Sequence, residues 1–211
     1  MNGYEKVKER KKAAIRRAAF ELFCERGVSG VKISDIAEKA GVSPVTIYNH
    51  FKSKEALFRD VFIRYIEERY LEFRDIIRDE TMGFREKIER LIFEEFRTQE
   101  HIKNREIMEK LMGSDKEIWK FWETLYKEKS LPLIMELVRS GQESGEIHPE
   151  LSMESVIFYI DMFYDQTVKH AQLFIDDPDS PLLRDLVRLF FYGLMGQRPS
   201  QGGEESGRSA F

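Results

Sequence analysis

Apolar residues recur at helical spacing along most of the chain, and glycines, prolines and serines separate these runs. Residues 6–26 predict a first helix, and Gly27 follows it as a C-terminal stop. The narrow apolar stripe of this helix consists of Ile15, Ala18, Ala19, Leu22 and Phe23. Residues 33–40 predict a second, much shorter helix.

Serine caps mark the next two helices. Ser43 precedes Pro44, and serine caps a helix N-terminus while proline suits the first helical position, so a third helix is predicted up to Phe51. Ser53 caps a fourth helix over residues 54–78. At 1.5 Å per residue this helix is roughly 37 Å long, and it is expected to join the N-terminal part to the rest of the molecule.

The remainder of the chain predicts only helices, so the fold class is all-α with about nine helices. Pro132 frees the carbonyl of Glu128 and predicts a kink in its helix. The further helices are expected at residues 84–98, 103–112, 113–140, 151–174 and 181–194. We predict a DNA-binding domain at residues 1–53, a helical ligand-binding and dimerisation domain at 54–196, and a polar, disordered tail at 197–211.

Two short helices joined by a turn that contains Gly41 are typical of a helix-turn-helix. Ile47 and Phe51 lie four residues apart and are expected to pack on the helix at 33–40, which leaves the opposite face of the third helix outward. A helix this short is not stable alone. It is therefore expected to be held by a scaffold and to enter the major groove of B-DNA, which accepts an α-helix.

The outward side chains suit DNA. Asn49 can bond two atoms of an adenine edge, and the apolar groups beside it can meet a thymine methyl. Neighbouring hydroxyl, imidazole and ammonium groups can bind phosphates. No arginine, the usual reader of guanine, lies on this face, so we predict a preference for A·T pairs. Alternatively, Tyr48 and His50 only cover the core. The predicted contacts are Lys32, Ser43, Pro44, Val45, Thr46, Tyr48, Asn49, His50 and Lys54.

The stretch VKISDIAEKAGVSPVTIYNHFKSKEALF resembles the signature of tetracycline-repressor-type (TetR family) regulators over about residues 10–60. The matching positions are Ile36, Ala37, Ala40, Gly41, Val42, Ser43, Thr46, Tyr48, His50, Phe51, Lys54, Glu55 and Leu57. Val45 and Lys32 depart from it, because small residues and a Thr or Ser cap are frequent there. The resemblance implies DNA contacts by Ser34, Thr46, Tyr48, His50 and Lys54, a ligand pocket and a dimer interface.

Two C-terminal helices are apolar nearly all round, as in VIFYIDMFY at residues 156–164. Such helices need cover on two sides, so we predict that they pair with the same helices of a second copy, forming a homodimer. The alternative is an internal hairpin within a monomer. The predicted interface residues are Ile157, Ile160, Asp161, Tyr164, Leu186, Leu189, Phe190 and Gly193.

Aromatic residues crowd the middle helices and would suit a lipophilic or aromatic small molecule, although core packing is the simpler explanation for any one of them. The predicted lining is Phe93, Phe96, Trp119, Trp122, Tyr126, Tyr159 and Phe163. Asp161 and Asp165 lie among apolar residues and would favour a cationic ligand if buried. The alternative is that they are exposed and form a solvated edge of the helix.

Charge supports a DNA partner only through its distribution. The net charge is −4, but residues 1–60 hold 13 Lys and Arg against 8 Asp and Glu, and residues 61–211 hold 21 against 30. A basic head on an acidic body would orient in the field of a polyanion. We detect no secretory signal and no bilayer-spanning run, and expect a cytoplasmic protein.

Enzymatic motifs are absent from the sequence. It contains no phosphate-binding glycine loop, HExxH, CxxC or nucleophile elbow, and its single cysteine is Cys24. We therefore expect no enzyme, no cofactor and no metal site. The favoured function is a repressor that dissociates from a pseudo-palindromic operator when a small ligand binds. The alternatives are an activator, or a DNA-binding regulator whose body binds a protein partner or only dimerises.

Overall fold

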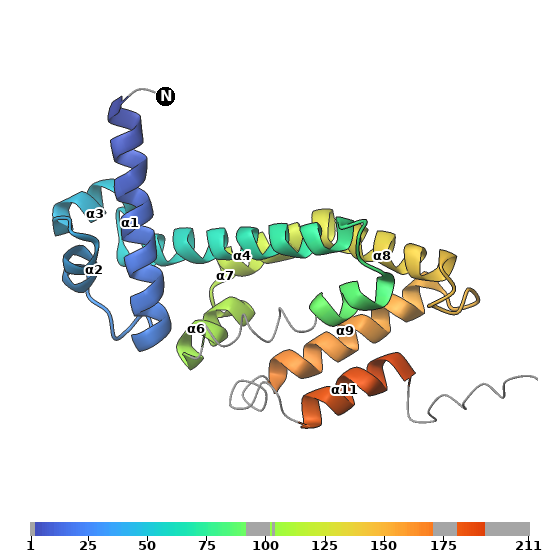
Figure 1. Ribbon diagram of the computed structural model, residues 1–211. Helices are drawn as coiled ribbons and strands as arrows, with labels where there is room; N and C mark the ends of the chain where they lie inside the picture. Colours follow the sequence, from blue (N-terminus) through green and yellow to red (C-terminus); the bar gives the residue numbers. More distant parts are fainter. Residues whose placement is uncertain (1–2, 92–101, 103, 171–180, 193–211) are drawn as a thin grey trace, which may run out of the picture.

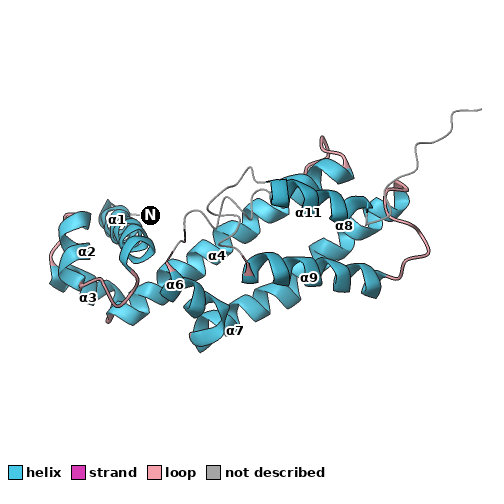
Figure 2. Cartoon of the chain, turned by 90° about the horizontal axis from the view of Figure 1, so that it is seen from below, coloured by secondary structure: helices cyan, strands magenta, loops and turns pink. Residues whose placement is uncertain are grey.

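The computed structural model describes residues 3–91, 102, 104–170 and 181–192. Within these ranges the chain forms helices, turns and loops and no strand, which confirms the all-α prediction. Figure 1 shows a small head at one end, the long helix α4 (Lys54–Arg78) leaving it, and a body of further helices at the other end. In the body, α8 (Leu131–Glu143) packs against both α4 and α9 (Met153–Lys169), and Figure 2 shows the same helices from below.

The head consists of α1 (Gly3–Arg26), α2 (Ile33–Ala40) and α3 (Pro44–Phe51), and α4 follows at Lys54–Arg78. These bounds agree with the prediction for the second, third and fourth helices, while α1 begins three residues earlier than predicted. The agreement has a local cause, because the hydroxyls of Ser43 and Ser53 accept hydrogen bonds from Thr46 N–H and Ala56 N–H at 3.2 and 3.0 Å.

The body begins with a helix that is described over residues 84–91. After α6 (Arg105–Glu109), a π-type turn at Lys110–Ser114 carries Gly113 at φ 119°, a region that favours glycine. The single helix predicted over residues 113–140 is α7 (Lys116–Leu125), a π-type turn (Tyr126–Ser130) and α8 (Leu131–Glu143). The turn lies directly before Pro132, so the predicted interruption is present as a widened turn.

The last two described helices are α9 (Met153–Lys169) and α11 (Pro181–Tyr192). Both predicted helices are therefore present, and the structure describes them over shorter ranges than predicted. The predicted disordered tail at residues 197–211 lies outside the described residues.

One apolar core extends from the head into the body. Phe23, Phe58 and Phe62 are its largest buried side chains, and Ile107 and Ile118 are fully buried in the same cluster. Ile102 joins them just before α6. A domain boundary at residue 53 therefore cuts through a continuous core rather than separating two. A second cluster, around Ile77, Ile88, Leu133 and Leu137, holds the far end of α4 in the body.

Because the core is shared, a substitution in the body is expected to destabilise the head as well. Ile118→Ala removes fully buried methyl groups and leaves a cavity, which is expected to lower the free energy of unfolding by about 2–5 kcal/mol. Urea titration followed by circular dichroism measures this, and hydrogen exchange of the α3 amides reports the head. Leu151→Ala, an exposed apolar residue, is the control and is expected to have little effect. Unchanged exchange in α3 would contradict a shared core.

Candidate nucleic-acid interface

The turn between α2 and α3 is fixed by local contacts. Gly41 adopts φ 65°, which permits the left-handed end of α2, and Val42 N–H donates to Ala37 O at 3.0 Å. Ser43 then caps α3, with Pro44 at its first position. The cap also holds the Thr46 hydroxyl at 2.9 Å from that of Ser43. Ser43 and Thr46 therefore set the start of α3 in addition to any contact with DNA.

Helix α3 has one buried and one exposed face. Ile47 is fully buried and Phe51 nearly so, whereas Val45 and Tyr48 are 66% and 51% exposed. Pro44 and Asn49 are exposed too. The simpler interpretation, that Tyr48 only covers the core, does not fit a side chain with half of its surface in solvent. The exposed face has the size and polarity to enter a DNA groove.

The N-terminus of α2 precedes α3 in the sequence, and its polar groups form hydrogen bonds with one another. The Asp35 carboxylate accepts from Lys32 N–H at 3.0 Å and from the Ser34 hydroxyl at 3.2 Å. The backbone hydrogen bond is the main cause of the lowered pKa of Asp35. The side chains of Lys32 and Ser34 are exposed, so their predicted phosphate contacts stay predictions.

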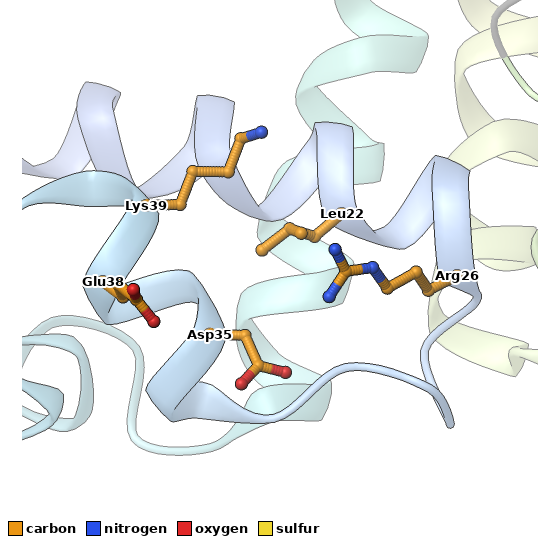
Figure 3. A pocket seen from close by; sticks show the side chains of 5 residues that line it. All are labelled: Leu22, Arg26, Asp35, Glu38 and Lys39. Atoms are coloured by element: carbon orange, nitrogen blue, oxygen red, sulfur yellow. The ribbon is translucent and has the colours of Figure 1, made fainter.

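A polar recess lies between α1 and α2 (Figure 3). It is lined by Leu22 and Arg26 of α1 and by Asp35, Glu38 and Lys39 of α2. Lys39 also forms an ion pair with Glu21 of α1 at 2.9 Å, which ties α2 to α1. Opposite charges surround the recess in equal number, so it favours neither an anion nor a cation.

Lys54 has an internal role that the sequence did not reveal. Its ammonium donates to the carbonyls of Val28 and Val31 at 2.8 and 2.9 Å. The lysine thereby closes the loop between α1 and α2 onto the start of α4. Two of its three N–H donors are occupied and one remains, so Lys54 positions this loop while its predicted phosphate contact stays a prediction.

His50 ends the exposed face of α3 and is half-buried. Burial lowers its pKa first, and the nearby Lys12, Lys8 and Lys11 lower it further, while Glu9 opposes them. The first turns of α1 therefore lie close to the C-terminal turn of α3. The sequence analysis did not include these lysines among the contacts, although the run KVKERKK was visible as a basic segment.

Residues 15–61, which contain this helix-turn-helix, match the family described as bacterial regulatory proteins, tetR family. The chain belongs to the TetR family of transcriptional regulators. It is 27% identical over 145 residues to the transcriptional repressor KstR2 of Mycolicibacterium smegmatis, covering 67% of this chain and 70% of KstR2. It is 28% identical over 199 residues to the uncharacterized regulator YdgC of Bacillus subtilis, covering 89% and 93%.

Solved structures share the fold. The TetR-like arrangement found here superimposes on the transcriptional regulator FadR from Bacillus subtilis, solved in complex with stearoyl-CoA, with a TM-score of 0.64. The match has 23% sequence identity and covers 86% of this chain and 98% of that chain. These relatives are transcriptional regulators and not enzymes.

Other chemistry of this TetR-family chain is limited. Among the residues that the structure describes, no group of three or more His, Cys, Asp and Glu side chains is placed to hold a metal ion. Burial raises the pKa of Cys24 to about 12, which disfavours a reactive thiolate and supports a structural thiol. None of the helices in the described ranges combines the length and apolar character needed to cross a bilayer.

The predicted ligand residues are only partly brought together. Trp119 and Trp122 stack at 5.0 Å between ring centroids, and Trp122 and Tyr126 at 5.3 Å. Tyr126 donates to Asp161 of α9 at 3.0 Å, and its pKa is raised to about 12 by burial first and then by that carboxylate. We call Trp119, Trp122 and Tyr126 the aromatic ladder.

The other predicted lining residues lie elsewhere. Tyr159 donates to the carbonyl of Leu189 in α11 at 3.4 Å. It lies two residues before Asp161, so its side chain leaves α9 on roughly the opposite side. Phe163 is half-buried. Phe93 and Phe96 fall outside the described residues.

The predicted dimer residues need a correction at Asp161. Its bond to Tyr126 turns it toward its own body rather than toward a second copy. Ile157, Ile160 and Leu186 are half-buried, and Leu189 is partly exposed. The side chains of Tyr164 and Phe190, that of Asp165, and all of Gly193 lie outside the description. Among the described side chains of α9 and α11, the exposed apolar residues are Phe158, Tyr159, Met162, Leu182 and Leu189, of which the prediction included Leu189.

Sequence reading by α3 is testable at Asn49. Asn49→Ala is expected to weaken binding to a preferred duplex by about 10- to 100-fold, because a paired amide contact to a base is worth roughly 1–3 kcal/mol. Its affinity for a duplex of unrelated sequence serves as the internal control and is expected to stay the same. Fluorescence anisotropy measures both. Equal loss on both duplexes would mean that Asn49 contacts only the backbone.

Proposed function

We propose that this TetR-family chain is a sequence-specific repressor that binds a pseudo-palindromic operator as a homodimer and is released by a small lipophilic ligand. The observation that carries the DNA-binding half is the division of α3 into a buried face of Ile47 and Phe51 and an exposed face of Val45, Tyr48 and Asn49. The head holds this helix rigidly, so its exposed face is available to a groove.

The dimer half of the proposal rests on the exposed apolar surface of α9 and α11. Phe158 is 73% exposed, and Met162 lies one helical turn further along the same face. Leu182 and Leu189 are exposed on α11, which contacts α9 through Tyr159. Burying this face against its copy would remove large apolar side chains from water. Two reading helices would then address successive major grooves about 34–36 Å apart.

The ligand half is supported by the aromatic ladder. Stacked rings with one tyrosine fixed by a carboxylate offer an apolar wall with a polar end. Stearoyl-CoA is the first compound to test, because the FadR structure that shares this fold was solved with it. A ligand shifts DNA affinity only through its different affinity for the two conformations of the body.

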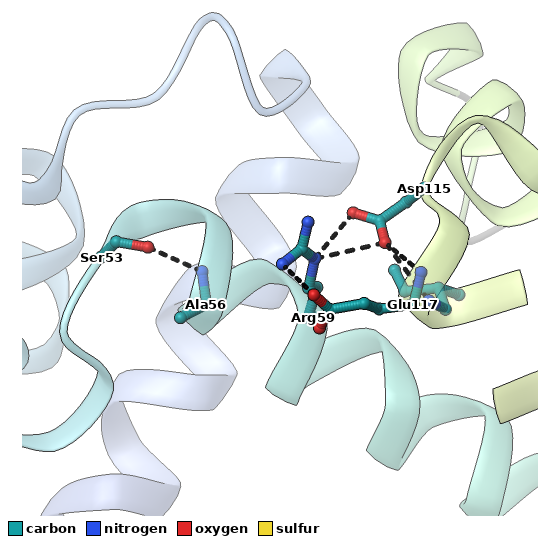
Figure 4. A network of polar contacts seen from close by, with 6 residues as sticks. Ser53, Ala56, Arg59, Asp115 and Glu117 are labelled. Atoms are coloured by element: carbon teal, nitrogen blue, oxygen red, sulfur yellow. Dashed lines mark hydrogen bonds and ion pairs between the residues drawn. The ribbon is translucent and has the colours of Figure 1, made fainter. Parts of the chain in front are cut away.

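A route from body to head exists at the start of α7 (Figure 4). The Arg59 guanidinium on α4 contacts Asp115 at 2.9 Å and Glu117 at 2.9 Å. Asp115 also caps α7 by accepting from Glu117 N–H and Ile118 N–H at 3.1 and 3.2 Å. Burial alone would raise the pKa of Asp115, but the bonds from Arg59 and these N–H groups outweigh it and lower the pKa.

A second link joins α6 to the loop after α1. The Glu106 carboxylate accepts from Ser29 N–H at 3.1 Å and from its hydroxyl at 2.9 Å. Lys110 lies over the Phe58 ring at 5.8 Å. A ligand that moves α7 or α6 would therefore pull on α4 and on the α1–α2 loop together, and so change the separation of the two reading helices in a dimer.

Selection of bound sequences from random duplexes tests the function. The expected result is a pseudo-palindrome rich in A·T pairs, bound by a dimer, followed by loss of binding with an effector from a panel that begins with stearoyl-CoA. Failure to enrich any sequence would reject the DNA-binding proposal. Enrichment without any effector would favour the alternative, a regulator whose body binds a protein partner or only dimerises. Placement of the site relative to a promoter separates repressor from activator.

The Arg59 link gives a prediction about coupling. Arg59→Gln removes both ion pairs from α4, so DNA affinity without effector is expected to change little while the effector-induced loss of affinity falls by at least about fivefold. Operator titrations with and without the active compound measure this. Arg64→Gln, a more exposed arginine on the same helix, is the matched control. An unchanged effector response in Arg59→Gln would exclude this route.

A further inference from the structure

The first turns of α1 extend beyond the rest of the head (Figure 1). Side chains 5–11 are all exposed, and the first fully buried residue of the helix is Ile15. We call residues 3–12 the α1 overhang. At 1.5 Å per residue it is about 15 Å long. Ordinary packing within the head does not account for this length.

The overhang changes the character of one continuous stripe. Ile15, Ala18 and Leu22 pack into the head core, and the same helical positions further toward the N-terminus are Lys11 and Lys8, at steps of four and seven residues from Ile15. The stripe is therefore apolar where α1 packs against the head and basic where α1 extends beyond the head. Lys8 and Lys11 are both exposed.

Helix α1 lies beside the end of α3, where the Arg16 guanidinium stands over the Phe51 ring at 5.6 Å from the ring centroid, and the basic stripe begins one turn before Arg16. Among the charged groups that act on His50, at the end of α3, are Lys12, Lys8 and Lys11, with Glu9 opposing them. Glu9 also pairs with Lys12 at 3.3 Å. In the described part of the chain, no acidic side chain forms an ion pair with Lys8 or Lys11. These two lysines therefore keep their charge available on the side where α3 presents its exposed residues.

The charge pattern is unfavourable for the isolated helix. Lys8 lies three residues from Lys11 and four from Lys12, and like charges at these spacings repel. A polyanion against the stripe would remove this penalty.

Some cations in and near the head are already committed. Arg16 bonds Asp60 at 2.6 Å, and on α4 Lys54 bonds two carbonyls and Arg59 bonds Asp115. The exposed face of α3 itself carries no lysine or arginine. Because phosphate contacts supply a large part of protein–DNA affinity, the cations that make them must come from outside that face.

We propose that the α1 overhang binds the DNA phosphate backbone beside the groove that α3 enters, with Lys8 and Lys11 as the contacting residues. This inference rests on the proposed DNA-binding function and adds to it a second contact surface on another helix. The overhang fixes affinity and register, because phosphate contacts carry no sequence information, and α3 reads the bases.

The test compares wild-type protein with Lys8→Gln/Lys11→Gln on the selected duplex at several salt concentrations. Glutamine favours helix about as well as lysine, so the overhang is expected to stay helical. Each neutralised phosphate contributes about 0.9 to the slope of log affinity against log salt. Because each protomer of the proposed dimer carries both lysines, the double variant removes four contacts and is expected to lower the slope by about 3.6 without changing which sequences are preferred. The matched control is Lys120→Gln/Arg139→Gln, which removes the same charge from exposed positions of the body.

Phosphate ethylation interference completes the experiment. Wild-type protein and the control are expected to share a set of sensitive phosphates, and Lys8→Gln/Lys11→Gln is expected to lose some of them. Lys8→Arg/Lys11→Arg is expected to restore both slope and pattern. A slope equal to that of the control, or an unchanged interference pattern, would overturn this inference alone. Wild-type protein that prefers no sequence would reject the proposed function as well.

Discussion

The burial of Ile107 and Ile118 against Phe58 and Phe62 is the interaction on which the arrangement of this molecule depends. These side chains come from α4, α6 and α7, yet they fill the same core as the helix-turn-helix. A head of three short helices has little apolar surface of its own to bury. Its stability therefore depends on side chains that arrive more than 40 residues later in the sequence, and the presentation of α3 depends on the body.

Polar contacts around this core fix the positions of the helices relative to one another, and they add little to the stability of the fold. Arg59 with Asp115, and Glu106 with Ser29, lie at its rim and are partly exposed, where ion pairs contribute little free energy. Their geometry is nonetheless specific, because Asp115 binds Arg59 and caps α7 with the same carboxylate. An apolar core alone would tolerate small sliding of α7 on α4. The carboxylate fixes the end of α7 to a single place on α4, so a movement of one helix is passed to the other.

Local signals predicted much of the fold. Ser43, Ser53 and Gly41 act within one turn of the chain, so they located the ends of α2, α3 and α4 to the residue. The direction of the α3 faces followed from the spacing of Ile47 and Phe51 in the same way. Contacts between distant segments could not be predicted, because periodicity shows which face of a helix is apolar and not what covers it. Asp161 was therefore predicted to contact a second subunit, although it bonds Tyr126. Lys54 was predicted to contact a phosphate, although it bonds Val28 and Val31.

In the head, the side chains that would contact bases are different from those that would attract DNA by their charge. The exposed side chains of α3 are neutral apart from the titratable His50, so they can discriminate bases by shape and hydrogen bonding with little non-specific pull. Attraction to a polyanion must come from cations placed outside that face, and several of the arginines in the head are held by carboxylates of the protein. Such a division leaves sequence preference insensitive to salt while affinity responds to it. It also means that a movement of α4, which tilts the head as one unit, would displace both the reading helix and the neighbouring cations from their phosphates at once.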